Sequence, residues 1–180
     1  MASYQLIEKQ VLYDGKKVRL ELHHLQSEED GSRTKREVCV HPGAVCVIPF
    51  VDDNTIILIR NKRYAVGQLL IELCAGTLDP KEAPINCAGR ELLEETGYLA
   101  KRLKPIGNFY TSPGILSEKM YAFAAYDLTK KQQALEEGED IELLSASWDE
   151  AVEMCRTGEI SDGKSIAAIL MYDRFFRNKT

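Results

Sequence analysis

Residues 76–98 read GTLDPKEAPINCAGRELLEETGY and set several carboxylates and one arginine around a single short predicted helix. On a helix, Glu91, Glu94 and Glu95 stand at positions i, i+3 and i+4, so their side chains share one face. Like charges at this spacing cost a few tenths of a kcal/mol per pair, and more if the face is covered. A positive partner is therefore expected there, and a hard divalent cation suits oxygen ligands. The stretch predicts a metal site that handles phosphate.

The composition is that of an ordinary globular protein: of 180 residues, 44% are hydrophobic and 28% are charged. A chain of this length can form one domain with a substantial core and a small appendage. The net charge of −5, without a long basic run, argues against a nucleic-acid partner. A polyanionic small-molecule substrate would need local basic groups or a metal ion.

The amino terminus, MASYQLIEKQ, lacks a basic segment followed by an apolar run. No stretch approaches the roughly 18 apolar residues that a membrane span requires, so we expect a cytoplasmic protein without a membrane partner. The five cysteines are odd in number, scattered and never in a CxxC pair. This pattern favours buried reduced thiols over a disulfide framework or a zinc site.

Alternating apolar residues from Gln5 to Gln26, with a turn at Asp14-Gly15, predict a β-hairpin. Two further strands follow, separated by a break at residues 41–43, and another strand begins after residue 53. The first half of the chain is therefore predicted to be β-rich. Because two exposed strands alone are marginally stable, we expect residues 1–40 to be a β appendage that packs on a partner subunit or on the main domain. Residues 41–180 would form that main domain.

Residues 69–76, LLIELCAG, predict one apolar strand that runs straight into Gly76. Pro84 suits an early helical position, and Gly97 suits the residue just past a helix end. The rest of the chain predicts strands near 103–113, 119–129 and 142–148, a charged and mobile loop at 130–142, and helices at 149–157 and 161–176. Mixed strands with central and terminal helices indicate an α/β sandwich rather than a doubly wound sheet.

The spacing of the fixed residues in 76–98 resembles the Nudix box of the Nudix hydrolases. The matching positions are Gly76, Glu82, Arg90-Glu91-Leu92, Glu94-Glu95 and Gly97, and Tyr98 stands where the family usually has an aliphatic residue. The resemblance implies a Nudix-type α/β/α sandwich with a mixed sheet. It also implies hydrolysis of a nucleoside diphosphate that is linked to another group.

Segments outside the box resemble the branch that contains ADP-ribose pyrophosphatases and nucleoside-diphosphate-sugar hydrolases. IELCAG is similar to the ELPAG lead-in of that branch, with Cys74 in place of the usual proline. Pro113 lies sixteen positions after Gly97, where the ADP-ribose group has a characteristic proline. REVCVHPGAV, SPGILSEK and GEDIE are similar to further segments, so the resemblance spans about Arg36 to Glu142.

The resemblance implies a bound Mg²⁺, with Mn²⁺ as an alternative. The implied principal ligands are Glu91 and Glu95, with Glu94 as a further ligand or neighbour and the carbonyl of Ala75 as a backbone ligand. Mg²⁺ would neutralise the charge that develops on the phosphoryl oxygens and bind the attacking water.

The catalytic residues implied by the resemblance extend beyond the metal ligands. Arg90 belongs to this set, and its expected role is an ion pair with Glu82 that holds the loop against the helix. In this branch the general base comes from a distal acidic loop, which favours Glu139 as base or metal ligand. Glu137 and Glu118 are further candidates for the base.

Arginines outside the box are candidate substrate ligands. Arg60 and Arg63 are expected to contact phosphate or ribose oxygens, because a guanidinium presents a planar fork of donors. By resemblance, Arg36 meets the nucleobase from a neighbouring subunit, and Pro113 belongs to the substrate site. The three histidines have no metal-ligand spacing, and the sequence suggests no Ser-His-Asp set, so catalysis by a protein nucleophile is given little weight.

The leading hypothesis is an Mg²⁺-dependent hydrolase that converts ADP-ribose to AMP and ribose 5-phosphate as a homodimer. The first alternative is the same chemistry on another nucleoside-diphosphate sugar, such as GDP-mannose or UDP-glucose. A second is a module that senses ADP-ribose without cleaving it. The intact box carboxylates favour an enzyme, and the motifs do not separate the substrates.

Overall fold

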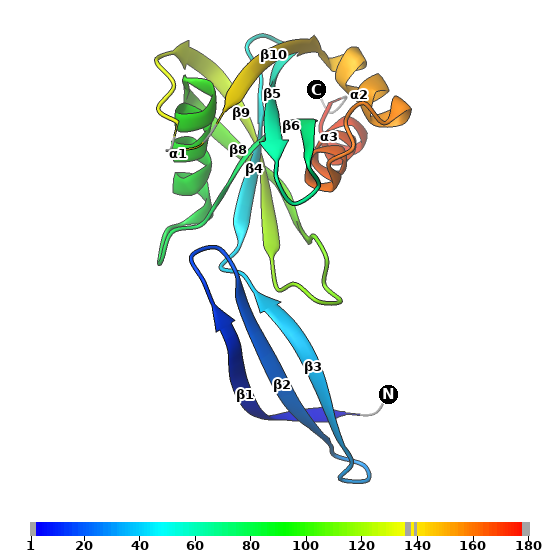
Figure 1. The fold of residues 1–180 in the computed structure, drawn as a ribbon. Helices are drawn as coiled ribbons and strands as arrows, with labels where there is room; N and C mark the ends of the chain where they lie inside the picture. Colours follow the sequence, from blue (N-terminus) through cyan, green and yellow to red (C-terminus); the bar gives the residue numbers. More distant parts are fainter. Residues whose placement is uncertain (1–2, 136–137, 139, 178–180) are drawn as a thin grey trace. The chain divides into compact units, whose positions relative to one another are not determined.

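The computed structural model describes residues 3–135, 138 and 140–177, and the chain divides into two compact units. One unit comprises Met1–Gly43 and Tyr110–Lys119, and the other comprises Ala44–Phe109 and Met120–Thr180. Figure 1 shows the course of the chain through the strands and helices of both units.

The first unit is built on a three-stranded antiparallel sheet in the order β1-β2-β3. Its strands are β1 (Tyr4–Asp14), β2 (Arg19–Ser27) and β3 (Arg33–Val40). The predicted hairpin is confirmed by the pairing of β1 with β2, and the turn is closed by a hydrogen bond from the Gly15 N–H to the Val18 carbonyl (2.9 Å). Every residue of β1 is exposed, which leaves apolar side chains of this strand uncovered within the described chain.

The second unit contains a four-stranded sheet in the order β7-β4-β9-β8 and a three-stranded sheet in the order β10-β5-β6. The strands are β4 (Ala44–Pro49), β5 (Thr55–Arg63), β6 (Gln68–Glu72), β7 (Cys74–Thr77), β8 (Tyr98–Tyr110), β9 (Lys119–Lys130) and β10 (Ile141–Ser147). Strand β4 pairs parallel with β9 and antiparallel with β7, so the four-stranded sheet is mixed. The predicted α/β class with a mixed sheet is confirmed.

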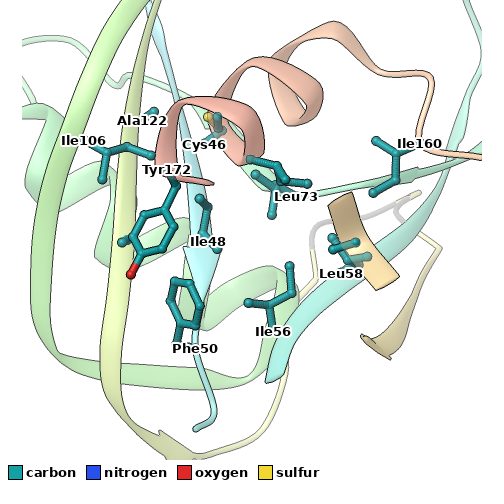
Figure 2. Packing of buried hydrophobic residues seen from close by; sticks show 14 of the residues in the cluster. Cys46, Ile48, Phe50, Ile56, Leu58, Leu73, Ile106, Ala122, Ile160 and Tyr172 are labelled. Carbon is teal, nitrogen blue, oxygen red and sulfur yellow. The ribbon is translucent and has the colours of Figure 1, made fainter. Parts of the chain in front are cut away.

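Strand β4 is buried along its whole length and divides the core into two layers. Its residues Cys46 and Ile48 pack with α2 (Trp148–Thr157) and α3 (Gly163–Phe175), as Figure 2 shows for part of this cluster. Val45 and Val47 point to the other face and pack with α1 (Pro84–Thr96). Because successive strand residues face opposite sides, a fully apolar strand is expected where helices cover both faces, and this gives the α/β/α sandwich.

The prediction of one strand over residues 69–76 was wrong. The segment forms two strands in different sheets: β6 pairs with β5, whereas β7 pairs with β4, and Leu73 between them belongs to neither strand. A run of buried apolar residues carries no periodic signal at which a strand could be divided. The split places the carboxyl end of β7 beside α1.

Helix α1 begins and ends where its sequence signals predicted. Pro84 occupies its first turn, and Gly97 ends it with a left-handed conformation (φ 68°). The Gly97 N–H donates to the Leu93 carbonyl at 2.9 Å. A side chain at residue 97 would be strained by this φ and would also meet the Gln133 backbone nitrogen at 3.0 Å.

Among the described residues, no helix is both long and apolar enough to cross a membrane.

Candidate metal and catalytic site

Helix α1 presents the three clustered carboxylates of the site at different depths. Glu95 is buried, with 4% of its surface exposed, whereas the side chains of Glu91 and Glu94 are 14% and 33% exposed. Glu95 Oε2 accepts a hydrogen bond from the Ala75 N–H at 2.9 Å. This bond joins the last turn of α1 to β7, so the predicted ligands Glu95 and Ala75 are in contact.

Gly76 is needed because the Glu91 carboxylate lies directly against its backbone. A Cβ built on Gly76 would stand 1.8 Å from the Glu91 carboxyl carbon. Glycine inside a strand often marks such a close approach. The missing side chain therefore provides the space in which the Glu91 carboxylate meets the strand.

Arg90 is the centre of an ion-pair network on α1. Its Nε and Nη2 donate to the two carboxylate oxygens of Glu82 at 3.1 and 2.9 Å, which is the predicted ion pair. Its Nη1 donates to Glu91 at 2.8 Å and to Glu94 at 3.0 Å. The hydrogen bonds to Glu82 are the largest cause of a raised pKa of Arg90. The positive partner expected for the clustered carboxylates is thus supplied, in this arrangement, by a guanidinium.

The Glu82–Arg90 pair should make stability depend on pH in the acid range. The hydrogen bonds from Arg90 lower the pKa of Glu82 from 4.5 to about 2. A group with a depressed folded-state pKa stabilises the fold above its ordinary pKa, and this contribution is lost as pH falls from 4.5 toward 2. In urea unfolding, Glu82→Gln should therefore destabilise the protein at pH 6 and lose most of this effect near pH 3. In an Arg90→Met background, the same substitution should show little pH dependence; an unchanged pH dependence there would contradict the pairing.

The residues that follow β9 are hydrogen-bonded to the carboxyl end of α1. The Ala134 N–H donates to the Glu94 carbonyl at 3.0 Å, and Gln133 Nε2 donates to the Glu95 carbonyl at 2.6 Å. The last carbonyls of a helix have no partners within the helix, so a following segment can satisfy them. The predicted loop is thus present at residues 131–135, and these hydrogen bonds hold it against α1. Glu137 and Glu139 lie outside the described residues.

Arg63 binds a buried carboxylate that sequence reasoning missed. Glu72 is 1% exposed and accepts from Arg63 Nε at 2.9 Å, from Arg63 Nη2 at 2.6 Å and from Lys164 Nζ at 2.5 Å. The hydrogen bonds to Glu72 are the largest cause of a raised pKa of Arg63. A glutamate inside the apolar run LLIELC was the available signal, because buried charges are normally paired. By contrast, Arg60 lies half-exposed, 3.7 Å from Glu142.

The remaining predicted site residues belong to the first unit. Arg36 is exposed, and its Nη1 donates to Thr34 Oγ1 at 2.9 Å and to the Lys35 carbonyl. Pro113 lies in an exposed turn in which the Leu116 N–H donates to the Ser112 carbonyl.

Glu118, a candidate base, is also in the first unit and has defined partners there. Its carboxylate accepts from Thr111 Oγ1 at 2.6 Å and lies 3.5 Å from His41 Nε2. The His41 ring accepts from the Gly43 N–H through Nδ1, which leaves Nε2 as the protonated nitrogen facing Glu118. The sequence contained no signal for this contact because the two residues are far apart in the chain.

The donor set at α1 suits a hard divalent cation. Its candidate ligands are carboxylate and backbone oxygens, and Gly76 allows Glu91 to lie close to the strand. Among the described residues, no group of three or more His, Cys, Asp or Glu side chains is already arranged around one metal position. In the structure, Arg90 binds the carboxylates of Glu91 and Glu94, and Glu95 accepts from the Ala75 N–H.

Comparison with known proteins identifies the family. A profile of the NUDIX domain matches residues 40–169, which is most of the chain. The chain belongs to the Nudix hydrolase family, as its box predicted. Members of this family generally use divalent metal ions.

Curated relatives match nearly the full chain. An ADP-ribose pyrophosphatase of Bacillus subtilis (strain 168) is 35% identical over 165 residues, covering 91% of this chain and 89% of the relative. A GDP-mannose pyrophosphatase of Enterobacter sp. (strain 638) is 34% identical over 175 residues, covering 90% and 91%. Both relatives are named as pyrophosphatases of a nucleoside-diphosphate sugar.

A solved structure described as an ADP compounds hydrolase shares the fold. Its TM-score is 0.85 with 22% sequence identity, and the match covers 97% of this chain and 94% of the other. The Nudix-type architecture expected from the sequence is therefore confirmed.

Proposed function

We propose that this protein hydrolyses ADP-ribose to AMP and ribose 5-phosphate with the help of Mg²⁺. The observation that carries the proposal is its similarity to an ADP-ribose pyrophosphatase along 91% of the chain, together with intact box carboxylates. In this reaction water attacks one phosphorus, the bridging P–O bond breaks, and each product keeps one phosphate. A GDP-mannose pyrophosphatase of similar identity supports the rival substrate class. The intact carboxylates count against a module that only senses ADP-ribose.

The proposed roles follow from the contacts around α1. Glu91, Glu94, Glu95 and the Ala75 carbonyl would hold Mg²⁺, with Mn²⁺ as a substitute. When bound, Mg²⁺ neutralises charge on the phosphoryl oxygens. Glu95 is held in place by the Ala75 N–H, and Gly76 leaves room for Glu91.

Arg90 and the residues outside the box take the remaining proposed roles. Arg90 keeps the loop that carries Glu82 against α1. Glu139 is the preferred base, and Glu137 and Glu118 are its alternatives. The half-exposed Arg60 and the Glu72-bound Arg63 are proposed to contact phosphate or ribose oxygens.

A homodimer is part of the proposal. Apolar side chains of β1, among them Leu6, Ile7 and Leu12, are between 43% and 50% exposed, and a second copy of the chain would cover them. In that dimer Arg36 would contact the nucleobase of the neighbouring site, and Pro113 would belong to the substrate site. Sedimentation at micromolar concentration tests this assembly.

The thiols of Cys46, Cys74 and Cys87, all buried, suit the reducing cytoplasm in which we place the protein.

A substrate panel tests the proposed reaction. With Mg²⁺ present, kcat/KM for ADP-ribose should exceed that for GDP-mannose and UDP-glucose by about tenfold or more, equivalent to about 1.4 kcal/mol of transition-state binding. Products should be separated by chromatography, with AMP and ribose 5-phosphate expected in equal amounts. The purified Glu95→Gln variant serves as the control for a contaminating hydrolase. A preference for GDP-mannose would support the alternative, hydrolysis of another nucleoside-diphosphate sugar. If none of the substrates were cleaved, a module that senses ADP-ribose would be favoured.

A further inference from the structure

The chain passes from one sheet to the other at Leu73, immediately before the predicted metal site. Leu73 is fully buried and lies between β6 and β7, outside both ladders. Its N–H donates to Ser165 Oγ at 2.8 Å, and Ser165 is also fully buried. A buried N–H without an acceptor is strongly unfavourable, so this contact constrains the path of the chain.

The first turn of α3 holds the same junction through a second contact. Lys164 Nζ bridges Glu72 Oε2 at 2.5 Å and Asp162 Oδ2 at 2.7 Å. Asp162 is the N-cap of α3, and its Oδ2 also accepts from Ser165 Oγ at 2.6 Å. The hydroxyl proton of Ser165 is therefore used by Asp162, and the oxygen is oriented to accept from Leu73.

The held junction is adjacent to the groups that orient two of the predicted ligands. Ala75, two residues after Leu73, donates its N–H to Glu95, and Gly76 lies under the Glu91 carboxylate. A shift of the backbone at residues 72–73 would move both contacts, because only Cys74 separates Leu73 from Ala75. Groups that orient metal ligands commonly change metal affinity when they are removed.

We propose that Ser165 and Lys164 are positioning residues that set the metal affinity of the α1 site by fixing the β6–β7 junction. The inference rests on the proposed function in so far as it takes Glu91 and Glu95 to be metal ligands. It adds that the metal site depends on the amino-terminal turn of α3, which carries none of the proposed ligands.

The test measures Mn²⁺ binding directly, without substrate. Free Mn²⁺ is followed by electron paramagnetic resonance while full-length protein is titrated, and the Kd of each variant is compared with wild type. Ser165→Ala should raise the Kd by about tenfold or more. Tyr172→Phe is the matched control, because it also removes a side-chain hydrogen bond of α3, the partly buried one between the hydroxyls of Tyr172 and Tyr126 (2.8 Å), and should leave the Kd within about twofold.

Lys164→Met provides a second variant, which decides the question should Ser165→Ala fail to fold. Loss of the Lys164 charge would by itself strengthen cation binding. A weaker Mn²⁺ affinity would therefore show that the ligands are displaced, and it would support the proposal. A wild-type Kd in Ser165→Ala, an equal rise in Tyr172→Phe, or tighter binding by Lys164→Met would overturn it.

The two proposals fail in different ways. Wild-type protein that does not bind Mn²⁺ would overturn both the metal site and this inference. Wild-type protein that binds Mn²⁺ but cleaves none of the panel substrates would overturn the proposed reaction. In that case the Kd comparison still decides whether the α3 turn positions the metal ligands.

Discussion

Replacing Glu95 with glutamine should lower kcat for ADP-ribose by roughly 100-fold or more while the fold stays intact. In the structure, the Ala75 N–H donates to Glu95 Oε2 at 2.9 Å. Glutamine has the shape of glutamate and keeps an oxygen that can accept this hydrogen bond. The substitution removes the negative charge that a divalent cation requires, and the metal supplies several kcal/mol of transition-state stabilisation. Steady-state kinetics over a range of Mg²⁺ concentrations measure the loss.

The stability of Glu95→Gln separates a metal role from a structural one. Its free energy of unfolding, measured in urea with EDTA present, should lie within about 1 kcal/mol of wild type because the partly buried hydrogen bond from the Ala75 N–H is retained. Glu153→Gln is the control, since Glu153 is an exposed residue of α2 that pairs with Arg156, and its kcat should change less than about twofold. If Glu95→Gln turned over as fast as wild type, Glu95 would not be a metal ligand.

Gly76→Ala should reduce kcat/KM by about 10- to 100-fold, the range for groups that orient metal ligands. The new Cβ would stand 1.8 Å from the Glu91 carboxyl carbon, so this carboxylate has to move. The displaced atoms are the end of a flexible side chain that is 14% exposed, and the change in stability should stay within about 1 kcal/mol. Kinetics and Mn²⁺ titration, combined with urea unfolding, measure both properties.

Gly89→Ala is the matched control on α1. A Cβ at residue 89 would meet only Leu103 Cδ1, at an ordinary contact distance of 3.6 Å. Alanine is favoured over glycine inside a helix, so stability should rise by about 0.5–1 kcal/mol with kcat/KM unchanged. An active Gly76→Ala variant would show that the position of Glu91 against the strand is not required.

Secondary structure could be predicted wherever local chemistry leaves a pattern. Pro84 and Gly97 mark the ends of α1 because proline lacks the N–H that the first turn does not use, and glycine adopts the left-handed cap without strain. The break between β3 and β4 at residues 41–43 was visible for a similar reason. The division of residues 69–76 was not visible, since continuous burial removes the alternation that separates faces.

The site was predictable in its residue types but not in its contacts. The spacing of Glu91, Glu94 and Glu95 placed three carboxylates on one helix face, and the ion pair between Arg90 and Glu82 was expected. The guanidinium shared by two of these carboxylates was not expected. The spacing of residues along a helix indicates which side chains share a face. The hydrogen-bond or ion-pair partner of each side chain depends on the elements that pack against the helix.

The sequence by itself determined the family, the α/β class and the charge that α1 brings to the site, because these follow from motif spacing and local conformational preference. Only the tertiary structure decided that Ala75 binds Glu95, that Gly76 makes room for Glu91, and that a turn of α3 holds the chain at Leu73. These contacts join residues between 15 and 92 positions apart along the chain. Such pairs leave no periodic signal, and they form only when β6, β7, α1 and α3 pack into one core.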